Sequence, residues 1–253
     1  MDFIFIAVLG GLWGSFANVC IYRLPLKGGV VKGRSFCPKC KKKILWYENI
    51  PILSYFLLGG KCSKCKKKIS TQYLIVEAIS IISFLIIYYL FGTSLTTILL
   101  IILFLSFLII FFIDLKHYII PDVLTFPMMA LGFFKSFDPN LSPIFPNYIN
   151  SLLGGIIGYG IIWLLIFFYK KIRNKEGMGL GDAKLLSAIG FWFGWISIPF
   201  VIFLSSVLAL LVVTPSLINK SKEMSSQIPF GPYLVLGSVL YLLLLEKIFR
   251  LLI

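Results

Sequence analysis

Charged residues are scarce in this chain of 253 residues: they make up only 13% of it, whereas 59% is hydrophobic. The mean hydropathy is +0.96. This composition excludes a soluble globular domain, because apolar runs of about 20 residues are long enough to cross a bilayer as helices. Histidine is nearly absent, with one residue, and there are five cysteines. These counts argue against a histidine-rich metalloenzyme.

The first apolar run also lacks the marks of a cleaved signal peptide. It opens with Met1 and Asp2, has no basic residue before Arg23, and is followed by no small-residue cleavage site. We therefore expect residues 3–22 to be a retained helix with its N-terminus outside the cell.

The apolar runs predict an all-α polytopic membrane protein with about eight transmembrane helices. No internal repeat of clear period is visible, and residues 135–147 are typical of a surface loop without chemistry. The run at 183–196 is short and contains Gly190 and Gly194. The expected spans are 3–22, 72–92, 94–114, 120–134, 148–169, 183–196, 198–218 and 231–250.

The formal net charge of +14 would suit a nucleic-acid-binding protein, but its distribution favours a membrane protein. Twenty-one of the 24 Lys and Arg residues fall in loops on one side of the predicted membrane, chiefly in 23–71, 170–184 and 219–230. Such asymmetry marks the cytoplasmic side. We therefore expect a lipid bilayer and no nucleic acid as a partner.

Four of the five cysteines form two C-x2-C pairs, separated by 21 residues, within the basic loop 23–71. Four thiolates at this kind of spacing suit tetrahedral zinc. The loop is too short to bury a core, so a metal would supply the folding energy. Four free or redox-exchanging thiols remain the alternative, while the reducing cytoplasm disfavours disulfides. The predicted zinc ligands are Cys37, Cys40, Cys62 and Cys65.

Two aspartates lie at the cytoplasmic ends of predicted spans. Asp114 closes the run at 94–114, and Asp182 precedes the run at 183–196. A carboxylate at membrane depth costs about 2.5–3.5 kcal/mol, so it usually marks a functional site. Two adjacent carboxyl groups share a proton, which lets one activate water while the other donates to a scissile carbonyl. The pair therefore indicates an aspartic peptidase.

Local structural roles compete with catalysis at these positions. Asp114 can pair with Lys116 at the interface, and Asp182 can cap the helix that follows it. Asp122 is expected to cap the span at 120–134. Gly179 and Gly181 permit a backbone path closed to other residues and would let another segment approach Asp182.

Two other classes of protein remain open. A transporter would also hold carboxylates among its helices, but usually near mid-bilayer at broken helices. A non-catalytic zinc-bearing scaffold is the second alternative. The predicted cytoplasmic side offers no Ser-His or Cys-His arrangement, and His117 stands alone.

Several motifs together resemble the type IV prepilin leader peptidases. The run 14–25 (GSFANVCIYRLP) is similar to the opening motif of that family, and 37–40, 46–55 (WYENIPILSY), 60–65 and 73–77 continue in the same order. Residues 114–122 and 179–185 match its two aspartyl motifs. The similarity runs from about residue 8 to 215, whereas the last helix matches only in being hydrophobic.

The resemblance implies a GxGD-type membrane aspartic protease of peptidase family A24, which cleaves prepilins and pseudopilins at the cytoplasmic face of the prokaryotic inner membrane. It implies that Asp114 and Asp182 are the catalytic residues and that Gly179 and Gly181 support them. It also implies N-methylation of the new N-terminus with S-adenosylmethionine; a peptidase without this activity is the alternative. No G-x-G-x-x-G pattern supports the methyl-donor site. The candidate polar residues for the methyl-transfer site are Glu48, Asn49 and Glu77. Hydrogen bonding at the membrane interface explains these residues equally well.

The expected organisation has three parts. A first transmembrane helix occupies 1–22, a cytoplasmic zinc module with four cysteine ligands occupies 23–71, and a transmembrane aspartic peptidase bundle occupies 72–253.

Overall fold

A computed structural model describes residues 1–26, 35–138, 141, 144–173, 179–218 and 228–252, with the backbone alone for 215–218 and 246–252. The predicted loop cations within 27–34, 174–178 and 219–227, and two loop prolines, Pro139 and Pro143, lie outside these residues.

Helices account for the regular secondary structure of the described residues, apart from two isolated β-bridges, so the all-α prediction is confirmed. The elements are α1 (Asp2–Arg23), η1 (Trp46–Asn49), α2 (Leu53–Leu57), α3 (Thr71–Phe91), α4 (Leu95–His117), α5 (Asp122–Phe134), η2 (Lys135–Phe137), α6 (Tyr148–Arg173), α7 (Leu180–Phe193), α8 (Ser197–Ile218) and α9 (Gly231–Leu252).

Five helices in the described part are long and apolar enough to cross a membrane: α1, α3, α4, α6 and α8. The protein is therefore a multi-pass membrane protein. The remaining predicted spans coincide with α5, α7 and α9. Since α5 and α7 have only 13 and 14 residues, the count of eight spans stays a prediction.

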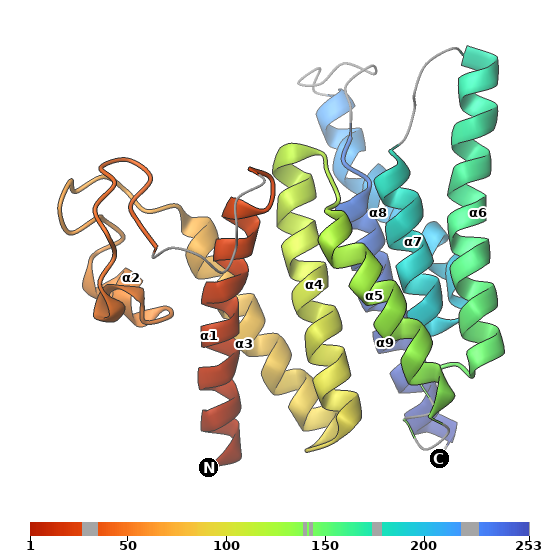
Figure 1. The fold of residues 1–253 in the computed structure, drawn as a ribbon, viewed down its shortest axis with the longest axis horizontal. Coiled ribbons are helices and arrows are strands. Elements are labelled where there is room, and N and C mark those ends of the chain that lie inside the picture. The colour runs from red at the N-terminus through yellow and green to blue at the C-terminus, as the bar shows by residue number, and fades with distance from the viewer. Residues whose placement is uncertain (27–34, 139–140, 142–143, 174–178, 219–227, 253) are drawn as a thin grey trace. The chain divides into compact units, whose positions relative to one another are not determined.

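The chain forms two compact units, Met1–Ile109 and Ile110–Ile253. In the first unit α1 packs closely against α3 (Figure 1). Glycines on α1 allow this approach: a Cβ built on Gly14 would lie 2.9 Å from the Cα of Glu77, and one on Gly10 would lie 2.9 Å from the Cα of Ile81. The first unit is therefore built on a glycine-lined helix pair.

The second unit is built around α7, which packs against α5, α6, α8 and α9 and lies between α5 and α6 in Figure 1. Gly154 on α6 and Gly190 on α7 face each other so closely that a Cβ on either would overlap the other's carbonyl group. Gly194, with φ at +81°, ends the helix. This packing fixes the position of the helix that carries Asp182.

Polar side chains also bind α7 to the helices around it. Ser187 donates to the carbonyl of Gly155, and Trp192 donates through Nε1 to that of Met128, both at 2.8 Å. The buried ammonium of Lys135 donates to the carbonyl of Trp192 at 3.0 Å, near the C-terminal end of the helix, where a positive charge is favourable. These bonds fix α7 in rotation and depth as well as in position.

Candidate active site and metal centre

Asp114 lies in the last turn of α4 and is buried, with 4% of its surface exposed. Its Oδ2 accepts the backbone N–H of Gly231 at 3.1 Å. Among the described residues it forms no ion pair with Lys116, so the alternative of an interfacial pair is not supported. The carboxylate is instead held inside the second unit by the first residue of α9.

Asp182 lies in the first turn of α7. Gly179, and not Asp182, is the N-cap residue, so the predicted N-cap position is wrong, but the backbone of Gly179 hydrogen-bonds the carboxylate of Asp182 at this end of the helix. The N–H of Asp182 donates to the carbonyl of Gly179 at 3.2 Å. Its carboxylate is near enough to Asp114 for the two charges to interact. The structure therefore brings both predicted aspartates together within one unit.

The two glycines of this turn do not adopt unusual backbone angles. Their role is to leave room for a neighbouring segment. Gly179 is extended, with φ at −83°, and Gly181 is not among the positive-φ residues, so the prediction of a special backbone path is wrong. The prediction of close approach holds at Gly181, where an added Cβ would lie 3.0 Å from the Cβ of Ile120. The segment between α4 and α5 thus reaches the aspartate turn because residue 181 has no side chain.

Asp122 does not cap α5, whose N-cap residue is Pro121 without a side-chain bond, so this prediction is wrong as well. Both carboxylate oxygens of Asp122 accept from Nζ of Lys184, at 2.7 and 2.8 Å. This two-contact ion pair joins the start of α5 to the start of α7. It therefore links the segment that follows Asp114 to the helix that carries Asp182.

Gly231 is a position of the site that was not among the residues predicted from the sequence. A Cβ at this residue would lie 2.7 Å from Oδ2 of Asp114 and 3.0 Å from Cδ1 of Ile120. Its N–H is also at the N-terminus of a helix, where negative charge is stabilised. The glycine after Phe230 and before Pro232 was the available signal, but the composition of the last helix is merely apolar.

The four predicted zinc ligands converge in the first unit. Their sulfur atoms all lie within 4.8 Å of one another, with Cys37 to Cys65 at 4.0 Å and Cys40 to Cys62 at 3.9 Å. Zinc–thiolate bonds of about 2.3 Å in a tetrahedron place sulfur atoms about 3.8 Å apart. The observed separations suit a four-thiolate metal site and are far too long for disulfide bonds of about 2.05 Å.

The two cysteine pairs have the same backbone structure. In each, the residue after the second cysteine has positive φ, +56° at Lys41 and +55° at Lys66, and donates to the carbonyl of the first cysteine. Antiparallel bridges join Phe36 to Lys43 and Lys61 to Lys68 in the corresponding places. The expectation of no internal repeat therefore fails within this module, which contains two copies of one metal-binding turn.

Backbone N–H groups also favour the metal-binding thiolate form of one cysteine, Cys62. N–H groups of Cys65 and Lys64 lower the pKa of the Cys62 thiol from 9.0 to about 6. Since the thiolate is the form that binds metals, Cys62 is ready to coordinate near neutral pH.

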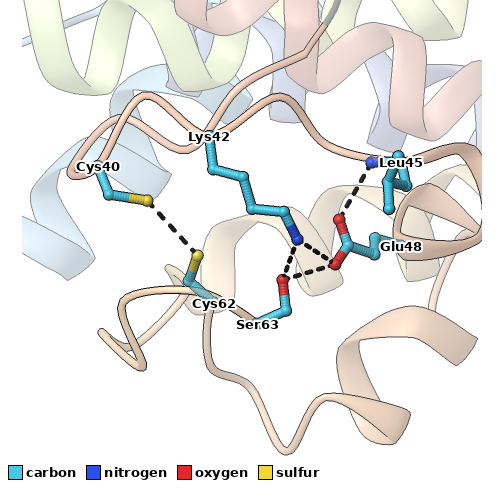
Figure 2. Close-up of polar contacts among 6 residues, drawn as sticks. All are labelled: Cys40, Lys42, Leu45, Glu48, Cys62 and Ser63. Atoms are coloured by element: carbon cyan, nitrogen blue, oxygen red, sulfur yellow. Dashed lines mark hydrogen bonds and ion pairs between the residues drawn. The ribbon is translucent and has the colours of Figure 1, made fainter.

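Glu48 holds the two cysteine turns together (Figure 2). Its Oε1 accepts from Nζ of Lys42 at 2.7 Å and from the hydroxyl of Ser63 at 2.5 Å, and its Oε2 accepts the N–H of Leu45 at 3.1 Å. These donors, Lys42 first, lower the pKa of Glu48 to about 2. The carboxylate of Glu48 thus makes its contacts within the module. A role for Glu48 in the methyl-transfer site stays a prediction.

The other two polar candidates lie on a different chain of contacts. Glu77 on α3 accepts the N–H of Ile52 through Oε2 at 2.8 Å and is hydrogen-bonded by Ser15. Nδ2 of Asn49 donates to the hydroxyl of Ser15 at 3.4 Å. The structure therefore brings Asn49 and Glu77 together through Ser15, whereas Glu48 makes its contacts elsewhere.

Comparison with known proteins assigns the chain to a family. Residues 8–91 match the bacterial peptidase A24 N-terminal domain, and residues 99–214 match the type IV leader peptidase family. The protein is 34% identical to a Pseudomonas aeruginosa protein over 96% of its own length and 90% of that protein. This chain belongs to the type IV leader peptidase family. The resemblance seen in its motifs is therefore confirmed.

Other relatives in the family agree in length and name. A Neisseria gonorrhoeae protein is 35% identical over 91% of this chain and 86% of its own length, and an Aeromonas hydrophila protein is 32% identical over 94% and 89%. Both, like the Pseudomonas protein, are called prepilin leader peptidase/N-methyltransferase. No solved structure matches the chain.

Proposed function

We propose that this protein cleaves the leader from type IV prepilins or pseudopilins and then methylates the new N-terminal amine with S-adenosylmethionine. The observation that carries the peptidase assignment is the pair of carboxylates on α4 and α7, Asp114 and Asp182, whose charges lie near enough to interact. Family membership supports the same reaction. It also disfavours the transporter and the scaffold, which nothing else in the described residues requires.

The geometry suggests which aspartate has which role. The N–H of Gly231 donates to Oδ2 of Asp114, and such a hydrogen bond favours the ionised form of the carboxyl group. We assign to Asp114 the ionised form that takes a proton from water. Asp182 gives its proton to the scissile carbonyl oxygen as water attacks the carbon. Collapse of this intermediate breaks the C–N bond and protonates the leaving amine.

The substrate fits the site through its membrane helix. A prepilin carries a basic leader followed by an apolar helix, which can lie in the bilayer against the enzyme and bring the scissile bond to the interface. The asymmetric distribution of Lys and Arg supports a multi-pass arrangement in the prokaryotic inner membrane, with the N-terminus outside and both aspartates on the cytoplasmic side. The leader would approach the acidic pair rather than the Lys-rich module.

The cofactors follow from the first unit. The four sulfur atoms suit a structural zinc ion, which would hold the two cysteine turns in place of a hydrophobic core. S-adenosylmethionine, when bound, supplies the methyl group. The division into helix 1–22, zinc module 23–71 and peptidase bundle 72–253 remains part of the proposal.

The peptidase assignment is tested by removing each carboxylate without changing its shape. Asp114→Asn and Asp182→Asn should each lower the cleavage rate of a purified prepilin by at least about 100-fold, because each removes an acid or base that acts in the transition state. Cleavage is measured by the mass shift of the pilin. Asp2→Asn, an exposed aspartate in the first turn of α1, is the matched control and should cleave normally.

Near-normal cleavage by either variant would show that the pair is not the catalytic centre. If the unaltered protein releases only unmethylated pilin with S-adenosylmethionine present, the chain is a peptidase alone.

A further inference from the structure

The first unit contains a buried carboxylate that neither the zinc site nor peptide hydrolysis uses. Glu77 lies on α3 and is 9% exposed. In the described part of the chain it has no ion-pair partner, in contrast to Glu48, which is neutralised by Lys42. A carboxylate with this degree of burial normally has a cation beside it. Within the described residues, no cation therefore balances the charge that Glu77 carries when it is ionised.

The hydrogen bonds of Glu77 leave room for such a cation. A carboxylate offers about four lone-pair positions. The N–H of Ile52 fills one on Oε2, and the hydroxyl of Ser15 fills a second. An ammonium group has three N–H donors and can take the two positions that remain.

The backbone at Ile52, whose N–H donates to Glu77, is strained, and the strained conformation makes this hydrogen bond possible. Ile52 has φ at +62° and ψ at −52°, and the N–H of Leu53 bonds the carbonyl of Pro51 at 2.6 Å. This is the three-residue γ-turn that is rare for any residue and least suited to a β-branched one. The turn directs the N–H of Ile52 at Glu77. Strain of this kind gathers at functional sites, where the surrounding structure maintains it.

The α1–α3 contact around Glu77 also holds polar atoms without partners. Oδ1 of Asn18 and Oγ of Ser80 are buried and have no hydrogen-bond partner among the residues that the structure describes. Ser80 is one turn beyond Glu77, and its Oγ would be 3.4 Å from a Cβ on Gly14, which also faces Glu77. Nδ2 of Asn18 donates to the carbonyl of Tyr73, one turn before Glu77. Unsatisfied groups therefore lie at the levels of α3 one turn before and one turn after Glu77, and groups of this kind are completed by a polar ligand.

We propose that Glu77 is the catalytic base of methyl transfer and that the hydrogen-bonded cluster it forms with Ser15 and Asn49 receives the N-terminal ammonium of the cleaved pilin. This rests on the methyltransferase part of the proposed function. Glu77 accepts one proton from the ammonium, and the neutral amine attacks the methyl carbon of S-adenosylmethionine. The bond between that carbon and sulfur breaks, its electron pair stays on sulfur, and the product is a methylated ammonium with S-adenosylhomocysteine.

The roles of the neighbours follow from their contacts. Asn49 and Ser15 form a relay of donors that ends on the carboxylate and orients it, so they are positioning residues. Ile52 fixes Oε2 from the side of the zinc module. Because that module presents the turn at 51–53, the proposal also explains why a metal site that does no chemistry belongs beside a methyl-transfer site.

The test uses the full-length protein, a pilin that has already been cleaved, and labelled S-adenosylmethionine. Glu77→Gln should lower methylation by at least about 100-fold, while prepilin cleavage by the same preparation stays close to normal. Retained cleavage shows that the variant is folded. Glu77→Asp should recover part of the rate, because it keeps the base at a shorter reach. Glu48→Gln is the contrast: it should reduce the metal content, which Glu77→Gln should not.

A second pair of variants examines the unsatisfied hydroxyl. Ser80→Ala removes a buried group with no partner, so the melting temperature should not fall, yet the KM for methylation should rise several-fold. Ser83→Ala removes a hydroxyl on the same helix that already bonds the carbonyl of Ile79, and its KM should not change.

The possible results separate the two proposals. If the unaltered protein does not methylate the cleaved pilin, the methyltransferase function fails and Glu77 has no such role. If it does and Glu77→Gln methylates equally well, the base lies elsewhere. If Glu77→Gln loses both activities, the Ser80→Ala and Ser83→Ala pair decides, and equal KM values for both would overturn the site.

Discussion

Gly231 matters because it has no side chain. Its N–H bonds Asp114 from the start of α9, and its α-carbon lies where any Cβ would press on the same carboxylate oxygen. The position therefore supplies both a hydrogen bond and the space in which that bond can form. Local sequence patterns do not reveal the partner of a glycine that acts on a residue 117 positions away.

Gly231→Ala should lower cleavage by on the order of 10–100-fold, because displacing a catalytic group by about 1 Å costs about that much. The measurement is kcat for prepilin cleavage. Gly160→Ala is the matched control, since a Cβ on this α6 residue meets nothing within 4 Å. Normal cleavage by Gly231→Ala would mean that Asp114 is placed by other contacts.

The ion pair between Asp122 and Lys184 has a smaller role. Asp122 is largely exposed, with 53% of its side chain accessible, so solvent screens the pair. Its geometry nevertheless links the first turns of α5 and α7 beside both aspartates.

Asp122→Asn should therefore reduce kcat/KM for cleavage by less than about 10-fold, as expected for an exposed pair worth about 0–1 kcal/mol. Lys184→Gln should have a similar effect, and the double variant should be no worse than either single one. A loss as large as that of Asp182→Asn would instead place Asp122 in the chemistry.

At the scale of elements, the two cysteine turns form a pair whose four sulfur atoms a metal would join. Each is a short loop with the same hydrogen bonds and the same left-handed lysine, and Glu48 is the main polar link between them. Neither turn has a buried apolar core of its own among the described residues. The metal is therefore expected to supply the stability of this part of the chain.

Purified protein should contain about one zinc ion per chain. Elemental analysis of the unaltered protein checks this. Cys40→Ser should lose most of the metal, because a serine hydroxyl replaces one thiolate of four, whereas Cys20→Ala, in α1, should retain it. Fully active protein with reduced cysteines and no metal would show that the site is not structural zinc.

Sequence patterns and contacts differ in what they reveal about these elements. Long apolar runs predicted α1, α3, α6 and α8 to within a few residues, since hydrophobic length alone decides them. The cysteine spacing predicted the convergence of four thiols. The γ-turn at Ile52, the pairing of Asp122 and the role of Gly231 could not be predicted, because each depends on a partner distant in sequence.

For the whole molecule, the proposal divides two activities between two compact units. In the proposal, cleavage uses Asp114 and Asp182, which lie in Ile110–Ile253, while Glu77 and the cysteine module lie in Met1–Ile109. A single helix, α4, contains residues of both units. Activities on separate units can be lost separately.

Asp114→Asn should still methylate a previously cleaved pilin at close to the normal rate, because methylation of an amine needs no activated water. The measurement is transfer of label from S-adenosylmethionine to the pilin N-terminus. Loss of both activities by this variant on cleaved substrate would mean that a single site performs both reactions.

The close glycine contact between α6 and α7 also has a consequence for biosynthesis. At about 1.5 Å per residue, the 14 residues of α7 extend about 21 Å, less than the hydrocarbon core of about 30 Å. On its own, α7 would therefore insert poorly from the translocon into the bilayer. The 26 residues of α6 are long and apolar enough to insert without a partner. Bulky replacements at Gly154 or Gly190 should leave α7 outside the membrane during synthesis, so quality-control proteolysis would remove the protein before its chemistry could be assayed.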